Sequence, residues 1–197
     1  MNIVFLRHGE AEPRDETGDF VENDLKRRLT EKGRYWQVPT DLGKFDLVIS
    51  SPAERAKETA RIASGGKEPV IIKSLSTHLW DGDWESVDGL FVNRGNISLE
   101  EVYSNASDKE MDAVRTISNE ALKEVENGIS KNKKSEPRIL IVGHAMFLPA
   151  LAEAFVGKYA QTIGSVIEMN KIVLGEGESF AYLSPRPRMR PVGRYGQ

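Results

Sequence analysis

Short apolar runs along the chain predict strands that are buried on both faces. They are the runs Ile3–Leu6, Asp46–Ser50, Val70–Ile72 and Arg138–Val142. Such runs, separated by helical patterns, are typical of a parallel sheet covered by helices on both sides. The pattern therefore predicts an α/β fold, a three-layer sandwich with a mostly parallel central sheet and helices on both faces. Two weaker pieces, 165–169 and 179–183, are expected to close the sheet.

Helix starts are marked by serines that are followed three residues later by glutamate, the spacing of a capping box. The pairs are Ser51 and Glu54, Ser98 and Glu101, and Ser107 and Glu110. Pro52 at the first helical position supports a helix from Ser51 to about Ala63. Amphipathic spacing after Ser107 predicts another helix, and 146–156 is apolar enough to be a buried one.

Three segments lack a clear period. The polar stretch Glu10–Arg28 is expected to be a long loop. The segment 74–105, with two tryptophans and three glycines, is expected to be an irregular insertion over the site, because long irregular segments in compact domains are often lids. The tail 185–197 carries four arginines and no acid. We interpret it either as a docking segment for an acidic partner, an anionic lipid or nucleic acid, or as a solvated or self-docking terminus. No repeat or linker divides residues 1–197, which we expect to form a single domain.

Composition narrows the chemistry. The 197 residues carry a formal charge of −3, and 39% are hydrophobic, as in ordinary globular proteins. The absence of cysteine excludes disulfides, thiolate metal sites and a cysteine nucleophile, and three histidines leave little room for a histidine-rich metal site. We expect no metal and no cofactor.

Charge and hydropathy also limit the partners and the location of the protein. The acidic balance argues against nucleic acid as the main ligand. No apolar run reaches about 18 residues, so no membrane partner is expected. The N-terminus lacks the basic region of a secretory signal, and we therefore expect a cytoplasmic protein. The oligomeric state stays open.

Polar residues follow three of the predicted strands. Arg7 and His8 come after the first strand, Arg55 lies just after the second, and His144 follows the strand that ends at Val142. Since ligands of open parallel sheets bind outside the carboxyl ends of the strands, these residues are expected at one edge. Two guanidiniums there match the oxygens of a phosphate, and a helix N-terminus adds free N–H groups. The sequence therefore predicts a phosphate site.

An imidazole beside such a phosphate can act as a nucleophile if it is neutral and in line with phosphorus. A second imidazole, if protonated, can stabilise the charge that develops on the phosphoryl oxygens. Taken alone, a histidine or arginine at a strand end is more often a hydrogen-bonded structural residue. The combination of two histidines and two arginines after separate strands favours the catalytic interpretation.

Three motifs resemble those of the histidine phosphatase (phosphoglycerate-mutase-like) superfamily. They are LRHGE at 6–10, SSPAERAKETA at 50–60 and VGHAMFLPAL at 142–151. The segment RRLTEKGR at 27–34 is similar to one in the small phosphohistidine phosphatase branch. The resemblance implies a parallel-rich sheet between helices and identifies His8 as the phosphorylated nucleophile. It further implies that Arg7, Arg55 and His144 complete the phosphate pocket, with Gly9 among the substrate-binding residues.

The proton donor departs from the family pattern. Many members carry an acidic residue four positions before the glycine of a loop that SLSTHLWDGDWES at 74–86 partly matches. Aligning Gly82 with that glycine places His78 at the donor position, and a histidine can serve as a general acid near neutral pH. Three acids nearby could replace it, namely Asp81, Asp83 and Glu85. The phosphohistidine branch needs no donor, because imidazole is a good leaving group.

These observations favour a metal-independent phosphatase acting through phosphorylated His8. Its substrate would be a small phosphomonoester or a phosphohistidine on a protein. Ala11 replaces the Ser or Thr that is common in mutases, which favours a phosphatase over a phosphoglycerate-type mutase. A catalytically idle regulator that binds a phosphorylated ligand is the alternative from a different class. Turnover that depends on His8 would separate the enzyme from the binder.

Overall fold

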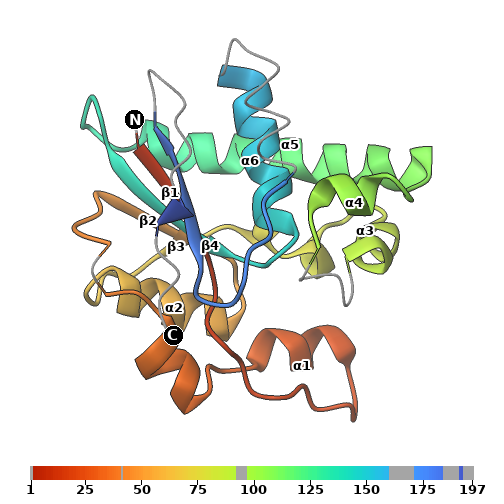
Figure 1. Cartoon of the computed structure of the whole chain (residues 1–197), viewed down its shortest axis with the longest axis horizontal. Helices are drawn as coiled ribbons and strands as arrows, with labels where there is room; N and C mark the ends of the chain where they lie inside the picture. The colour runs from red at the N-terminus through yellow and green to blue at the C-terminus, as the bar shows by residue number, and fades with distance from the viewer. Residues whose placement is uncertain (1, 41, 92–96, 160–170, 184–190, 193–197) are drawn as a thin grey trace.

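The computed structural model describes the chain except residues 1, 41, 92–96, 160–170, 184–190 and 193–197. Its centre is a six-stranded sheet in the order β3-β2-β4-β1-β5-β6 (Figure 1). The strands are β1 (Asn2–Arg7), β2 (Leu47–Ser50), β3 (Val70–Ile71), β4 (Arg138–Gly143), β5 (Ser179–Leu183) and β6 (Pro191–Val192). The first four are parallel, while β5 and β6 add an antiparallel edge. The expected mostly parallel α/β sheet is confirmed.

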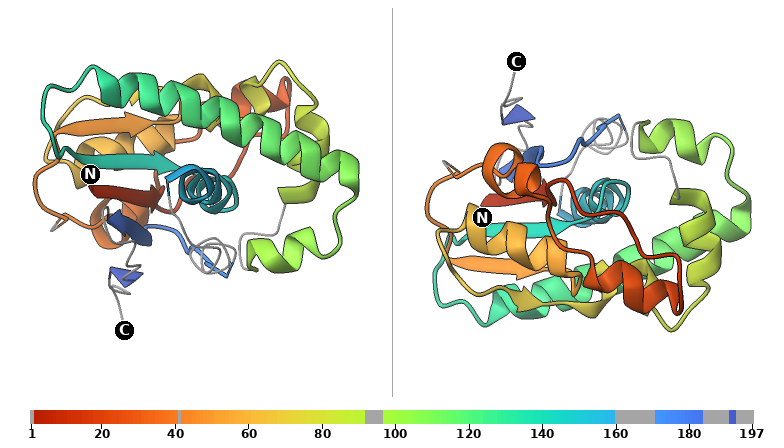
Figure 2. Two further views of the ribbon diagram at one scale, coloured as in Figure 1. Left: turned by 90° about the horizontal axis from the view of Figure 1, so that it is seen from above. Right: turned by 90° about the horizontal axis from the view of Figure 1, so that it is seen from below.

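Alternate residues of the central strands pack into two separate cores. On β1, Ile3 and Phe5 join one core, whereas Val4 and Leu6 join the other. The first core is covered by α5 (Asp108–Ser130) and α6 (Phe147–Tyr159), and the second by α2 (Glu54–Ala63). The two views of Figure 2 show these helices on opposite faces of the sheet. Both faces of β1, β2 and β4 are buried, which is why these runs are continuously apolar, whereas Val70 and Ile71 of β3 are exposed.

Two of the three predicted capping serines, Ser98 and Ser107, are confirmed. Ser107 and Glu110 form the reciprocal capping box at the start of α5. Ser98 accepts a hydrogen bond from the backbone N–H of Glu101 at the start of α4 (Leu99–Tyr103). A further helix, α3 (Trp84–Phe91), precedes α4 in the chain. The segment 74–105 was expected to be irregular. Its described residues contain two short helices, and two 3-10 turns lie at Lys73–Leu75 and Thr77–Leu79.

The loop predicted over Glu10–Arg28 contains a helix, and this prediction was wrong. Helix α1 (Phe20–Lys26) begins after Asp19, whose side chain accepts a hydrogen bond from the Glu22 backbone N–H. The spacing of Asp19 and Glu22 resembles a capping box, and it was hidden by the polar composition of the stretch. The segment after α1 continues into a π-helical turn at Gly33–Gln37.

Ser51 is not the cap of α2. The helix begins at Glu54, two residues later than predicted, and its N-cap residue Ala53 has no side-chain cap. The Ser51 hydroxyl instead accepts from the Ala53 backbone N–H at 3.3 Å and contacts His144. Of the other predicted elements, 165–169 lies outside the described residues, and of the tail 185–197 only Pro191–Val192 is described, as strand β6 beside β5. None of the helices in the described part of the chain could cross a membrane.

Candidate active site

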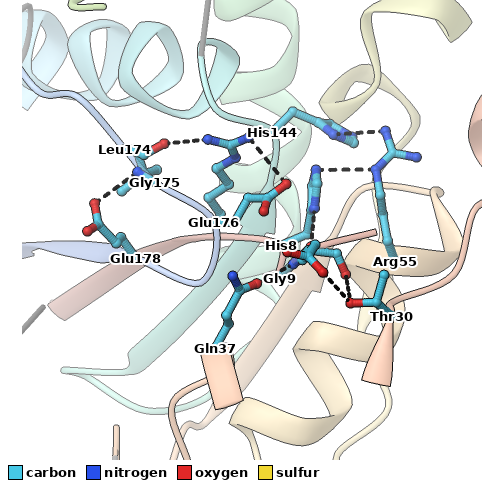
Figure 3. Close-up of polar contacts among 12 residues, drawn as sticks. His8, Gly9, Thr30, Gln37, Arg55, His144, Leu174, Gly175, Glu176 and Glu178 are labelled. Carbon is cyan, nitrogen blue, oxygen red and sulfur yellow. Dashed lines mark hydrogen bonds and ion pairs between the residues drawn. The ribbon is translucent and has the colours of Figure 1, made fainter. Parts of the chain in front are cut away.

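The pocket lies at the carboxyl ends of β1 and β4 and beside the first turn of α2. Because β4 pairs with both β1 and β2, the ends of these three strands are neighbours. The pocket has a volume of about 340 Å³. Five of the predicted residues line it together: Arg7, His8, Arg55, His78 and His144. Figure 3 shows the Arg55 side chain in contact with both His8 and His144.

His8 is buried and held in one tautomer. Its Nδ1 lies 2.8 Å from the Gly9 carbonyl, which can only accept, so Nδ1 carries the proton. Its Nε2 accepts from Arg55 Nε at 3.2 Å. Burial, followed by the Arg55 guanidinium and His144, lowers the pKa of His8 well below 6.5. His8 is therefore a neutral imidazole with its Nε2 lone pair at the pocket.

Gly9 is fixed by contacts from two other segments, α2 and the turn at Gly33. Its backbone N–H donates to the hydroxyl of Thr59, which in turn donates to the Arg55 carbonyl. A Cβ on Gly9 would lie 2.8 Å from the carbonyl oxygen of Gly33, so this close backbone approach requires glycine. The peptide that orients His8 is thereby anchored to α2. No Gly9 contact with a ligand needs to be assumed to explain its presence.

The segment 27–34 supports the same turn. Thr30 donates its backbone N–H to the Glu10 carbonyl at 2.9 Å and its hydroxyl to the Glu10 carboxylate at 2.9 Å. Lys32 forms an ion pair with that carboxylate at 2.7 Å. A Cβ on Gly33 would lie 2.2 Å from the Glu10 carbonyl oxygen. Glu10 therefore braces the turn after β1 and does not line the pocket.

His144 completes the pair of imidazoles. The rings of His8 and His144 lie 5.3 Å apart between centroids and meet edge to face. Arg55 Nη2 lies 3.4 Å from His144 Nδ1, which must accept, so Nε2 donates to the Ser51 hydroxyl at 3.0 Å. Burial and then Arg55 lower the pKa of His144 well below 6.5. The imidazolium expected here is thus a neutral imidazole in the ligand-free pocket, and an entering anion would favour its protonation.

Arg7 lines the pocket from the end of β1, and its Nε donor is unused. Its Nη1 donates to the Leu174 carbonyl at 2.8 Å, and its Nη2 lies 3.7 Å from Glu176 (Figure 3). Its buried Nε has no hydrogen-bond partner among the described residues. A buried donor without a partner is costly, and an anion in the pocket would satisfy it.

Asp24 is a pocket residue that the sequence analysis missed. It lies on α1, within the stretch predicted to be a loop. Its carboxylate lies 2.8 Å from Arg55 Nη2 and 3.2 Å from Arg27 Nη1. Burial alone would raise the pKa of Asp24, but Arg55 and Arg27 outweigh it and lower that pKa overall. The Asp19 cap was the signal that could have placed a helix, and hence Asp24, beside α2.

His78 lines the pocket and is held between two carboxylates. Its Nε2 lies 2.7 Å from Asp88, whereas its Nδ1 lies 3.8 Å from Asp24, beyond hydrogen-bond distance. The rings of Phe20 and Trp84 meet the imidazole edge on. Nδ1 is therefore the uncommitted nitrogen.

The acids considered as replacements for His78 do not reach the pocket. Asp83 accepts from the backbone N–H of Ser86 at the start of α3 and forms an ion pair with Lys109. Asp81 lines a separate surface depression, and Glu85 is exposed. The carboxylates that line the pocket are instead Asp24 and Asp88.

The pocket is cationic overall and polar at its base. It is lined by four arginines, Arg7, Arg14, Arg27 and Arg55, against two aspartates. Arg14 lies at the exposed side with its guanidinium 3.9 Å from the centre of the Phe20 ring. Within the described ranges, no group of three or more His, Asp or Glu side chains could hold a metal ion. This arrangement suits a phosphorylated ligand.

Comparisons with known proteins agree with this geometry. The family model described as "Histidine phosphatase superfamily (branch 1)" matches residues 3–170, most of the chain. No curated protein matches this chain significantly.

Several solved structures share the fold. A phosphoserine phosphatase of Entamoeba histolytica, solved with 3-phosphoglyceric acid, is 18% identical with a TM-score of 0.56, covering 100% of this chain and 97% of its own. A mycobacterial glucosyl-3-phosphoglycerate phosphatase is 18% identical with a TM-score of 0.58, covering 96% of both chains. A candidate phosphohistidine phosphatase, SixA of Agrobacterium tumefaciens, is 16% identical with a TM-score of 0.54, covering 98% and 95%. At these identities the likeness concerns the fold.

Proposed function

This chain belongs to the histidine phosphatase superfamily, and on that premise we propose that it is a phosphatase that forms a phosphohistidine on His8. One observation carries the proposal. His8 is neutral, its Nδ1 proton is tied to the Gly9 carbonyl, and its Nε2 lone pair accepts from Arg55 Nε at 3.2 Å, a donor that an entering phosphoryl group would draw to its own oxygens. A nucleophile needs this combination of tautomer, charge and access.

In the first step, Nε2 of His8 attacks phosphorus and the bond from phosphorus to the leaving oxygen breaks. The bonding pair stays on that oxygen, which takes a proton from a general acid. The imidazole becomes a cationic phosphoimidazole whose Nδ1–H still donates to the Gly9 carbonyl. Arg7, Arg55 and a protonated His144 balance the charge on the phosphoryl oxygens, so the mechanism needs no metal.

In the second step, water attacks phosphorus and the N–P bond breaks, returning its electron pair to Nε2. The water proton goes to the group that served as the acid, and inorganic phosphate leaves. The enzyme is then restored, with every proton accounted for.

We assign His78 as that acid for phosphomonoesters. In the acid form both ring nitrogens carry protons: Nε2–H donates to Asp88, and the proton on the uncommitted Nδ1, which lies 3.8 Å from Asp24, passes to the leaving oxygen. This arrangement favours a small phosphomonoester as substrate over protein phosphohistidine, because an imidazole leaving group needs less help from an acid. His78→Ala should therefore slow an aryl phosphate more than a phosphoramidate. Equal slowing of both would remove the assignment.

The function is tested by turnover of an aryl phosphate and of phosphohistidine without added metal, with His8→Ala as control. We expect wild-type turnover of the aryl phosphate, loss of it in the variant, and an acid-labile phosphoryl group on His8 in rapid-quench samples. Phosphohistidine turnover alone would make the protein-bound substrate the better proposal. Phosphate binding without turnover would favour an idle binder, and phosphoryl transfer to an acceptor in place of hydrolysis would favour a mutase.

A further inference from the structure

We propose that Asp24 is a positioning residue that sets the orientation of Arg55 for phosphoryl transfer. The inference rests on the proposed function, because it concerns the same pocket. Asp24 holds Arg55 by two groups at once: its backbone carbonyl accepts from Nη1 and its carboxylate accepts from Nη2 at 2.8 Å. Both side chains are nearly buried, with 5% and 10% of their surfaces exposed.

A guanidinium offers two forked faces, one formed by its two terminal nitrogens and the other by Nε and one of them. Asp24 occupies the terminal face of Arg55. The remaining face points at the two imidazoles, with Nε 3.2 Å from His8 Nε2 and Nη2 3.4 Å from His144 Nδ1. A phosphoryl group bound between the imidazoles would therefore meet the Nε side of Arg55 and no other.

This division of the guanidinium explains why the pocket contains a carboxylate. A carboxylate beside a phosphate site normally repels the ligand, but this one is paired with Arg55 at 2.8 Å and with Arg27 at 3.2 Å. The lowered pKa of Asp24 keeps it ionised near neutral pH, so it is not the acid of the first step. Its charge holds two arginines in place and also lies 3.8 Å from Nδ1 of His78.

The opposite interpretation is that Asp24 competes with the ligand for Arg55 and inhibits the free enzyme. The two interpretations predict effects of opposite sign when the charge is removed. If Asp24 positions Arg55, a neutral residue weakens the transition state. If Asp24 competes, a neutral residue strengthens anion binding.

The test compares Asp24→Asn with wild type and with Asp19→Ala. Asparagine keeps the backbone carbonyl and the size of the side chain but loses the charge. Asp19→Ala is the matched control, because it removes the cap of α1 without touching Arg55. Tm of each variant is measured first, and the assays are run well below the lowest Tm.

We expect kcat of Asp24→Asn for an aryl phosphate to fall about 10- to 100-fold, as for a small misplacement of a catalytic group, with KM changing less than about threefold. Affinity for orthovanadate, a mimic of the transition state, should fall in parallel with kcat/KM, while affinity for inorganic phosphate should fall less. Asp19→Ala should keep nearly wild-type kcat. An equal loss in Asp19→Ala would mean that Asp24 only holds the helix, and would overturn the inference.

Unchanged kcat with tighter phosphate binding in Asp24→Asn would also overturn it. The proposed function fails separately, when wild-type protein forms no phosphohistidine and has no turnover. In that case the vanadate and phosphate affinities still decide about Asp24, because they measure the pocket without chemistry.

Discussion

Replacing Thr59 with valine should loosen the nucleophile from a position outside the pocket. Thr59 lies on α2, is fully buried, and its hydroxyl joins two functional segments. It accepts from the Gly9 backbone N–H at 3.2 Å and donates to the Arg55 carbonyl at 2.8 Å. Valine has nearly the same volume and the same β-branching, so the change removes these hydrogen bonds with little effect on packing.

The magnitude follows from the group that is left behind. The Gly9 N–H would be buried without a partner, which costs about 1–3 kcal/mol of unfolding free energy. For a chain of this length, each kcal/mol corresponds to about 2–4 °C in Tm, so Tm should fall by about 2–12 °C. The Gly9 carbonyl, which holds the His8 Nδ1 proton, belongs to the same residue, and we expect kcat to fall about tenfold as His8 loses its fixed orientation.

Thr59→Ser is the matched control. Serine keeps the hydroxyl and loses one methyl group, which costs about 1 kcal/mol through lost burial. Thermal unfolding and aryl phosphate turnover should then separate the two variants: both lose stability, but only Thr59→Val loses kcat. Wild-type kcat in Thr59→Val, or an equal loss in Thr59→Ser, would refute the role of this hydrogen bond in orienting His8.

Unfolding free energy should fall as pH drops below about 6.5, because burial lowers the pKa values of His8 and His144 and the unfolded chain then binds the extra protons. Each histidine adds a slope of about 1.4 kcal/mol per pH unit down to its folded pKa, and urea unfolding of His8→Asn should show a shallower dependence. Arg55→Ala should cost up to about 3–5 kcal/mol in urea unfolding, because the buried Asp24 carboxylate loses the nearer of its two arginines and keeps only Arg27; the double variant with Asp24→Asn should recover stability but not turnover. A double variant as unstable as the single one would contradict the pairing. Arg14→Ala should raise KM for a phosphomonoester with a second anionic group and leave kcat for an aryl phosphate unchanged, because Arg14 lies at the exposed side over Phe20. If Arg14→Ala changed KM by the same factor for both substrates, Arg14 would not have this role.

The sequence was informative about the sheet because its strands β1, β2 and β4 are buried on both faces. Residues such as Ile3 and Val4 pack into different cores, and so every position of the run must be apolar. The same logic located β4 and the position of His8 after β1. It failed over Glu10–Arg28, where a seven-residue helix with a mostly polar surface leaves little periodic signal.

Local motifs also predicted which residues lie together in the pocket, but not the hydrogen bonds that they form. The order of strand ends placed Arg7, His8, Arg55 and His144 at one edge, and the structure brings them together there. The local motif assigned Ser51 wrongly as a helix cap. Its hydroxyl can either cap a helix or contact another side chain, and the side chain that it contacts, His144, lies 93 positions away in the chain. A contact at such separation leaves no local signal.

Tertiary structure alone decided the charge and tautomer of the site. The neutral state of His8 depends on burial and on Arg55, which is held in turn by Asp24 from a helix that precedes it by 31 residues. Likewise, only the folded chain selects His78 and leaves Asp83 on the surface with Lys109. Residue types and strand order are written along the chain, whereas protonation and orientation depend on desolvation and on neighbours that come together only in the fold.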